Sequence, residues 1–187
     1  CGIVTLLVLY RIGKRLRNEV FGLLWVLAYL GSILPHLYFR SGIIDPWFNL
    51  FIFLSVHALI LLSWGRKDRP VGWQGSGTMK YAVLMGMFLG LGGLTKAPVA
   101  PLIFGLTAGI YWFLQRFRLF VSIPKALLSV VVMFAVAFVW FGVDWLVNGS
   151  WFLDTFITYQ IRLFSTPDAG HGGFFGYHFV VLLFGCF

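Results

Sequence analysis

The chain has 187 residues, of which 60% are hydrophobic and only 11% are charged. This composition excludes a water-soluble domain, because too few polar side chains remain to cover a globule. It predicts an all-α, polytopic transmembrane helical bundle, and at ~20 residues per span the length allows about six or seven spans. The net charge of +8 does not indicate nucleic-acid binding, because the basic residues form short clusters between apolar segments, as in membrane proteins.

The apolar segments follow one another in a regular order. Residues 1–10 are expected to be the end of a helix, with spans at 21–38, 47–64, two within 81–114, one at 126–147 and another from 178. The region 81–114 is long enough for two helices, and the turn Thr95-Lys96-Ala97-Pro98 divides it because proline is favoured at a helix start. Pro35 is expected to be tolerated inside its span, where neighbouring helices can satisfy the freed carbonyl. Gly86, Gly90, Gly92 and Gly93 permit close helix packing or a locally irregular backbone.

The basic residues divide unevenly between alternate breaks in the apolar pattern. The breaks that follow residues 10, 64 and 114 hold eleven of the fourteen, namely Arg11, Lys14, Arg15, Arg17, Arg66, Lys67, Arg69, Lys80, Arg116, Arg118 and Lys125. The alternate breaks hold Arg40, Lys96 and Arg162. Because cytoplasmic loops carry an excess of Lys and Arg, the first set is predicted to be cytoplasmic. Asp45, Lys96 and residues 148–177 then share the outer face.

Residues 148–177 are the one long polar stretch and are expected to form an extracytoplasmic loop bearing part of a site. Arg162, Asp168 and His171 lie there among glycines and aromatic residues. Charge, imidazole and rings at a bilayer boundary favour a ligand site. An interfacial loop with aromatics at headgroup level would have the same composition, so both interpretations stay open.

Four residues of the outer face are candidates for chemistry. The Asp45 carboxylate, at a span end beside cations, suits a general base or metal ligand, although a simple N-cap before Pro46 explains it as well. Lys96 suits a phosphate, because it lies in a tight turn where orientation charge is sparse. Arg40 fits snorkelling to headgroups better. The glycines beside His171 permit close backbone approach, which favours a site role over a solvated loop histidine.

Three segments in order carry a resemblance to a known family: Asp45-Pro46-Trp47-Phe48-Asn49-Leu50-Phe51, Leu94-Thr95-Lys96-Ala97-Pro98, and Arg162 through His171 to Tyr177. They resemble the polyprenyl-phosphate-sugar-dependent membrane glycosyltransferases of the GT-C fold, the group containing protein O-mannosyltransferases and the lipid A aminoarabinose transferase. The resemblance covers most of the chain and implies one transmembrane glycosyltransferase domain over residues 1–187. It implies transfer of a hexose or pentose from a polyprenyl-phosphate donor to a lipid or protein acceptor, in lipopolysaccharide or protein glycosylation.

The resemblance also assigns roles and a location. It implies that Asp45 is catalytic and that Lys96 and Arg162 bind the donor phosphate. It also implies that His171 and Asp168 lie near the acceptor or near a divalent metal ion, with His171 as the ligand of that metal. It implies a multi-pass protein of the bacterial inner membrane, with its site facing the periplasm or exterior and with membrane lipids as its surroundings. The family's principal catalytic aspartate belongs to an outer loop before residue 1, so the chain is expected to be an internal fragment, inactive alone. The sequence departs from the family at Ala97, where glycine is usual.

The expected reaction is a single displacement with inversion at the anomeric carbon. A carboxylate activates the acceptor, and cations or a metal stabilise the departing lipid phosphate. The alternative is a lipid or solute transporter that catalyses no reaction, because broken helices also build sites at the membrane midplane. A transporter predicts matched interruptions in two halves of the chain, and no convincing internal repeat is present.

Overall fold

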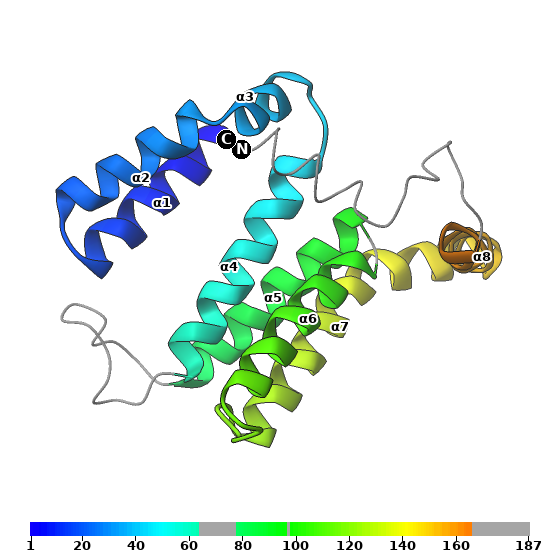
Figure 1. Ribbon diagram of the computed structural model, residues 1–187. Coiled ribbons are helices and arrows are strands. Elements are labelled where there is room, and N and C mark those ends of the chain that lie inside the picture. Colours follow the sequence, from blue (N-terminus) through cyan, green and yellow to red (C-terminus); the bar gives the residue numbers. More distant parts are fainter. Residues whose placement is uncertain (64–77, 97, 166–187) are drawn as a thin grey trace.

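The computed structural model describes residues 1–63, 78–96 and 98–165, and these ranges form eight helices without a strand. The helices are α1 (Gly2–Leu16), α2 (Glu19–Gly31), α3 (Ile33–Arg40), α4 (Asp45–Ser63), α5 (Thr78–Lys96), α6 (Val99–Leu114), α7 (Ile123–Asn148) and α8 (Trp151–Ser165). Over the described ranges the predicted all-α fold is confirmed. Helices α4 to α7 run up and down beside one another, the α1–α2 hairpin lies on the α4 side, and α8 lies beyond the end of α7 (Figure 1).

Helix α5 is the centre of the bundle, and small residues let α7 approach it closely. Ala82, Gly86 and Gly90 are four residues apart and therefore share one face of α5. A Cβ atom at Gly86 would overlap the carbonyl oxygen of Ser129, and one at Gly90 would lie 2.7 Å from Cβ of Val136. The Ser129 hydroxyl donates a buried hydrogen bond to the Ala82 carbonyl at 2.8 Å. The close packing predicted for Gly86 and Gly90 is confirmed.

The predicted division of residues 81–114 is also confirmed. Helix α5 ends at Lys96 and α6 begins at Val99. The Thr95 hydroxyl donates to the Gly92 carbonyl at 2.6 Å, and Leu102 N donates to the Pro98 carbonyl at 3.1 Å as the first turn of α6 forms. A Cβ atom on Gly92 would lie 3.0 Å from Cβ of Ala100, so this glycine lets α6 fold back against α5.

The expected span at 21–38 is wrong as a single helix. It is two helices, α2 and α3, separated at Ser32, whose backbone is extended with φ −76° and ψ 135°. Pro35 supplies the reason, because a proline ring clashes with the carbonyl four residues earlier, here Gly31, and cannot donate a backbone hydrogen bond. The break therefore falls before the proline, in its preceding turn.

Two expected loops also contain helix. Helix α1 continues past residue 10 to Leu16, so Lys14 and Arg15 occupy its last turn, where their charges favour the negative end of the helix dipole. Residues 151–165 of the expected outer loop form α8, while residues 166–177 lie outside the described residues. One face of α8 carries Phe152 and Phe156, which contact Phe141 of α7 with ring centroids 6.4 and 5.3 Å apart.

Two described helices, α4 and α7, are long and apolar enough to cross a membrane by length and composition. Helices α2 and α6 are apolar but have 13 and 16 residues. Only 11% of the most apolar stretch of α7 is buried inside the fold, against 44% of that of α4. Large apolar side chains such as Val139, Leu146 and Val147 are more than two-thirds exposed on α7.

Candidate functional site

Two of the predicted site residues meet in the structure. Lys96, in the last turn of α5, forms a salt bridge through Nζ to the Asp45 carboxylate in the first turn of α4. The two residues belong to different breaks in the chain, and the antiparallel packing of α4 on α5 brings these helix ends together (Figure 1). The sequence predicted that Asp45 and Lys96 share a face, but did not predict that they bond to each other.

The local sequence explains why each charge is stable at its position. A carboxylate is favoured at a helix N-terminus and a cation at a helix C-terminus, and Asp45 and Lys96 occupy these positions. Asp45 is not the N-cap of α4, because the backbone amides of Trp47 and Phe48 donate to the Ile44 carbonyl at 3.0 and 3.2 Å. Its carboxylate is engaged with Lys96 instead, so capping does not account for this side chain.

The ion pair is only partly covered. The Asp45 side chain is 26% exposed and that of Lys96 is 42% exposed. Nζ of Lys96 also lies over the ring of Phe48, 5.6 Å from its centroid, which gives the cation an aromatic support. Exposed ion pairs contribute little to stability, about 0–1 kcal/mol. The accessible ammonium has three donors, of which the salt bridge to one carboxylate oxygen takes one.

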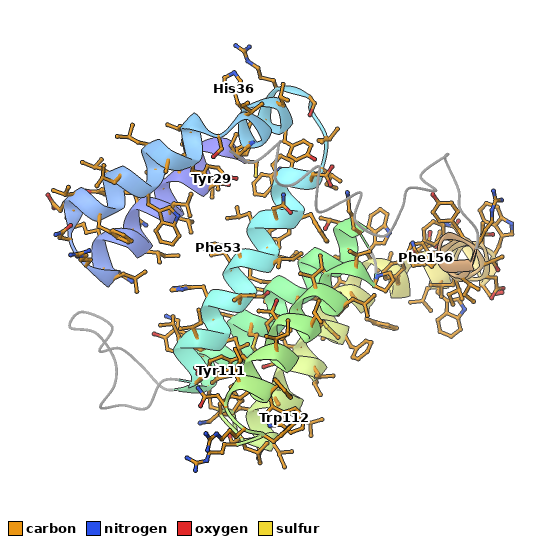
Figure 2. All side chains as sticks on the ribbon, in the orientation of Figure 1. Tyr29, His36, Phe53, Tyr111, Trp112 and Phe156 are labelled. Atoms are coloured by element: carbon orange, nitrogen blue, oxygen red, sulfur yellow. The ribbon has the colours of Figure 1, made fainter. Side chains whose placement is uncertain are left out.

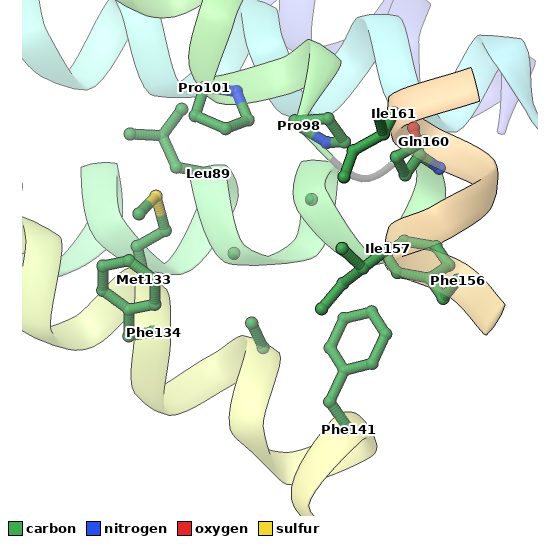
Figure 3. Close-up of a pocket in the computed structure, with 13 residues that line it drawn as sticks. Leu89, Pro98, Pro101, Met133, Phe134, Phe141, Phe156, Ile157, Gln160 and Ile161 are labelled. Atoms are coloured by element: carbon green, nitrogen blue, oxygen red, sulfur yellow. The ribbon is translucent and has the colours of Figure 1, made fainter. Parts of the chain in front are cut away.

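A wide apolar cavity of about 350 Å³ lies beside the end of α5 that carries Lys96. It is enclosed by α5, α6, α7 and α8, and Gly93 and Pro98 in its wall lie three residues before and two residues after Lys96. Figure 3 shows Met133, Phe134 and Phe141 from α7 facing Phe156, Ile157 and Gln160 from α8 across this space. Among its described lining residues Gln160 alone has an amide, so the cavity suits an apolar chain.

A second cavity, of about 420 Å³, adjoins the pair on the α4 side. Its walls come from α1, α2, α3 and α4, and Pro46 and Asn49 place it next to Asp45. Figure 2 shows Tyr29 and Phe53 in the space between the α1–α2 hairpin and α4. This lining combines aromatic rings with hydroxyl and amide groups, and it therefore differs in polarity from the first cavity.

A further carboxylate lies near the C-terminal end of α7. One oxygen of Asp144, Oδ1, accepts a hydrogen bond from Nδ2 of Asn148 at 2.8 Å. The other oxygen, Oδ2, is buried without a hydrogen-bond partner among the described residues. Nothing in the local sequence spacing indicates an unpaired oxygen at Asp144.

The remaining candidates are not brought to the ion pair by any described contact. Arg40 lies exposed in the last turn of α3, and Arg162 lies exposed in the last turn of α8, the helix that closes the apolar cavity. Asp168 and His171 fall outside the described residues. Over the described ranges no group of three or more His, Cys, Asp or Glu side chains gathers where a metal could bind. The metal role of His171 stays a prediction.

Asn49 and Tyr29 were not singled out in the sequence, although both line the cavity beside Asp45. Asn49 offered a signal, because it lies four residues after Asp45 and residues at that spacing share a helix face. The sequence contains no such signal for Tyr29, because this residue lies at the cavity only as a result of the way α2 and α3 fold back. No protein-family model, curated protein or solved structure matches this chain.

Proposed function

We propose that the protein is an integral membrane glycosyltransferase that moves a sugar from a polyprenyl-phosphate donor to a lipid or protein acceptor on the extracytoplasmic face. The observation that carries the proposal is the Asp45–Lys96 pair, which joins two of the three segments on which the family resemblance rests. The pair offers a carboxylate and an ammonium, both accessible, at the end of the bundle where the chain breaks. A phosphate-linked sugar donor needs both kinds of group.

The chemistry assigned to the pair follows from its donors and acceptors. Lys96 keeps N–H donors beyond the one engaged with Asp45, and these suit the oxygens of the lipid phosphate. Positive charge there stabilises the phosphate as it departs from the anomeric carbon. The Asp45 carboxylate, held by Lys96, accepts the proton of the attacking acceptor hydroxyl. The sugar–phosphate bond breaks as the sugar–acceptor bond forms, with inversion at the anomeric carbon.

The multi-pass arrangement is part of the same proposal. Helix α7 exposes large apolar side chains along most of its surface, and in water each exposed Å² would cost about 25 cal/mol. Lipid chains remove that cost. Lys80, Arg116 and Lys125 lie at the opposite end of the bundle from Asp45 and Lys96, as a cytoplasmic basic end requires (Figure 1). The proposed membrane is the bacterial inner membrane.

The test uses the full-length protein in sealed membrane vesicles with a polyprenyl phosphate carrying radiolabelled sugar. We expect label to become covalently attached to a lipid or protein acceptor, and Asp45→Asn, which keeps the shape but removes the charge, to reduce this at least tenfold at equal expression. Gln115→Leu, a change just after the far end of α6 and therefore at the opposite end of the bundle, is the control and should transfer normally. If the label crosses the membrane without covalent transfer, the protein is a transporter and the glycosyltransferase assignment is wrong.

A further inference from the structure

The cavity on the α4 side has the size and lining of a small-molecule site. Its volume of about 420 Å³ lies within the range of ligand pockets, roughly 300–1,000 Å³. Tyr29, Tyr38, Phe39 and Phe53 supply rings, and the Tyr29 ring packs against that of Phe39 with centroids 6.1 Å apart. Asn49 supplies an accessible amide.

The polar groups of this cavity are neutral. The Asn49 amide has two donors and an acceptor, and each tyrosine hydroxyl can donate and accept. None of the described residues that line this cavity carries a charge. Uncharged hydrogen-bonding groups placed among aromatic rings suit a ligand that has many hydroxyl groups and also apolar C–H faces. A phosphate or carboxylate would find no cation inside this cavity.

The position of the cavity links it to the ion pair. Asp45, Asn49 and Phe53 follow at intervals of four residues and share one face of α4. A group bound between Asn49 and Phe53 therefore lies one to two helical turns along α4 from Asp45. The apolar cavity lies on the other side of the pair, beside Pro98. An apolar cavity thus lies near the end of α5 that carries Lys96, and a neutral polar cavity lies beside the first turns of α4.

We propose that the cavity between α1, α2, α3 and α4 holds the sugar of the donor, with Asn49 as the residue that determines which sugar is accepted. This inference rests on the proposed function and adds to it a subsite and a specificity residue. Lys96 holds the phosphate at the mouth, Asn49 hydrogen-bonds to sugar hydroxyls, and the rings of Tyr29 and Phe53 cover the C–H faces of the sugar. Asn49 touches the sugar but takes no part in breaking its bond to phosphate.

The test compares binding of a polyprenyl phosphate, free and carrying mannose, glucose or aminoarabinose, to the full-length protein in detergent. We expect the wild type to bind one of the sugar-bearing forms more tightly than the free phosphate. Asn49→Leu keeps the approximate size but removes the hydrogen bonds, so the preference should fall roughly three- to tenfold while binding of the free polyprenyl phosphate is unchanged. Lys96→Met should weaken binding of the free and sugar-bearing forms alike.

The outcomes separate this inference from the proposed function. A wild-type protein that binds the free and sugar-bearing lipids equally would overturn the sugar subsite, even if it transfers sugar. An Asn49→Leu variant with unchanged sugar preference and unchanged melting temperature would overturn it as well. If Asn49→Leu loses the sugar preference, the sugar subsite is supported. If the wild-type protein also shows no sugar transfer, the glycosyltransferase assignment is wrong although the subsite stands. Tyr29→Phe, which removes one hydroxyl and keeps the ring, gives a second reading and should also reduce the preference.

Discussion

Helix α5 passes through two regions that differ in packing and charge. Along its middle, Gly86 and Gly90 lie against α7 so closely that no side chain fits between the helices. At its end, Lys96 reaches an accessible carboxylate on α4 beside two cavities. The middle region is apolar and buried, while the end is charged and partly open.

The difference separates stability from function. In the middle of α5, van der Waals contact and one buried hydrogen bond hold the helices together, so a change there should act on folding. At the end of α5, a partly exposed ion pair adds little to stability and leaves its donors accessible. A change there should act on ligand binding and leave the fold intact.

The largest effect is expected at Lys96. Lys96→Met keeps most of the apolar stem and removes the charge, and loss of a charge-assisted contact to phosphate costs on the order of 1.5–3 kcal/mol, or roughly ten- to a hundredfold in donor use. Lys96→Arg keeps the charge and should recover part of the loss. Donor kinetics and membrane insertion of both variants provide the measurement. Unchanged kinetics in a well-inserted Lys96→Met protein would remove the phosphate assignment.

The packing side of the comparison is tested by a pair of matched substitutions. Gly86→Ala places a Cβ atom against the Ser129 carbonyl and should lower stability by about 1–3 kcal/mol through overpacking. Gly105→Ala makes the same change on α6, where nothing lies within 4 Å, and should raise stability by up to about 1 kcal/mol because alanine favours helix. Thermal unfolding in detergent distinguishes them. Equal melting temperatures would show that α5 and α7 are not in close contact.

These two regions could not be predicted equally well from the sequence. Turn chemistry at Pro98 located the α5–α6 break, because that signal is local. The glycines of α5 indicated either close helix packing or an irregular backbone, and only the structure shows which of the two holds. The break at Ser32 was missed because Pro35 acts on the preceding turn. The pairing of Asp45 with Lys96 depends on the antiparallel packing of two helices, which no local pattern encodes. The cavity beside Asn49 depends on the fold-back of α2 and α3, so its lining could not be read from spacing.

The smallest effect is expected at the other end of the molecule, in the ion pair of Lys14 with Glu19. The hydrogen bond to Lys14 and then its charge lower the pKa of Glu19 below 4.5, and Glu19 likewise raises the pKa of Lys14 above 10.5. The lowered pKa of Glu19 contributes stability above about pH 4.5, and this stability is lost as the pH falls through the folded pKa. The raised pKa of Lys14 contributes stability below about pH 10.5, and this stability is lost as the pH rises through the folded pKa.

Both groups are fully exposed, so the contribution is small and screened by salt. Glu19→Gln should lower the melting temperature slightly at pH 7 and low salt, and the difference should disappear as the pH falls through the lowered pKa of Glu19. Sugar transfer should be unchanged in this variant, since the pair lies between α1 and α2 at the chain's first basic cluster. A marked loss of transfer in Glu19→Gln would contradict the assignment of function to the Asp45–Lys96 end.

The most direct test of the central claim exchanges the two charges. The double substitution Asp45→Lys with Lys96→Asp preserves an ion pair between α4 and α5, although each charge now opposes its helix dipole at a cost of about 0.3–1 kcal/mol. If the pair binds phosphate and activates the acceptor, the double variant should insert and fold but transfer sugar at less than a hundredth of the wild-type rate. Transfer at the wild-type rate would show that the pair only joins two helices.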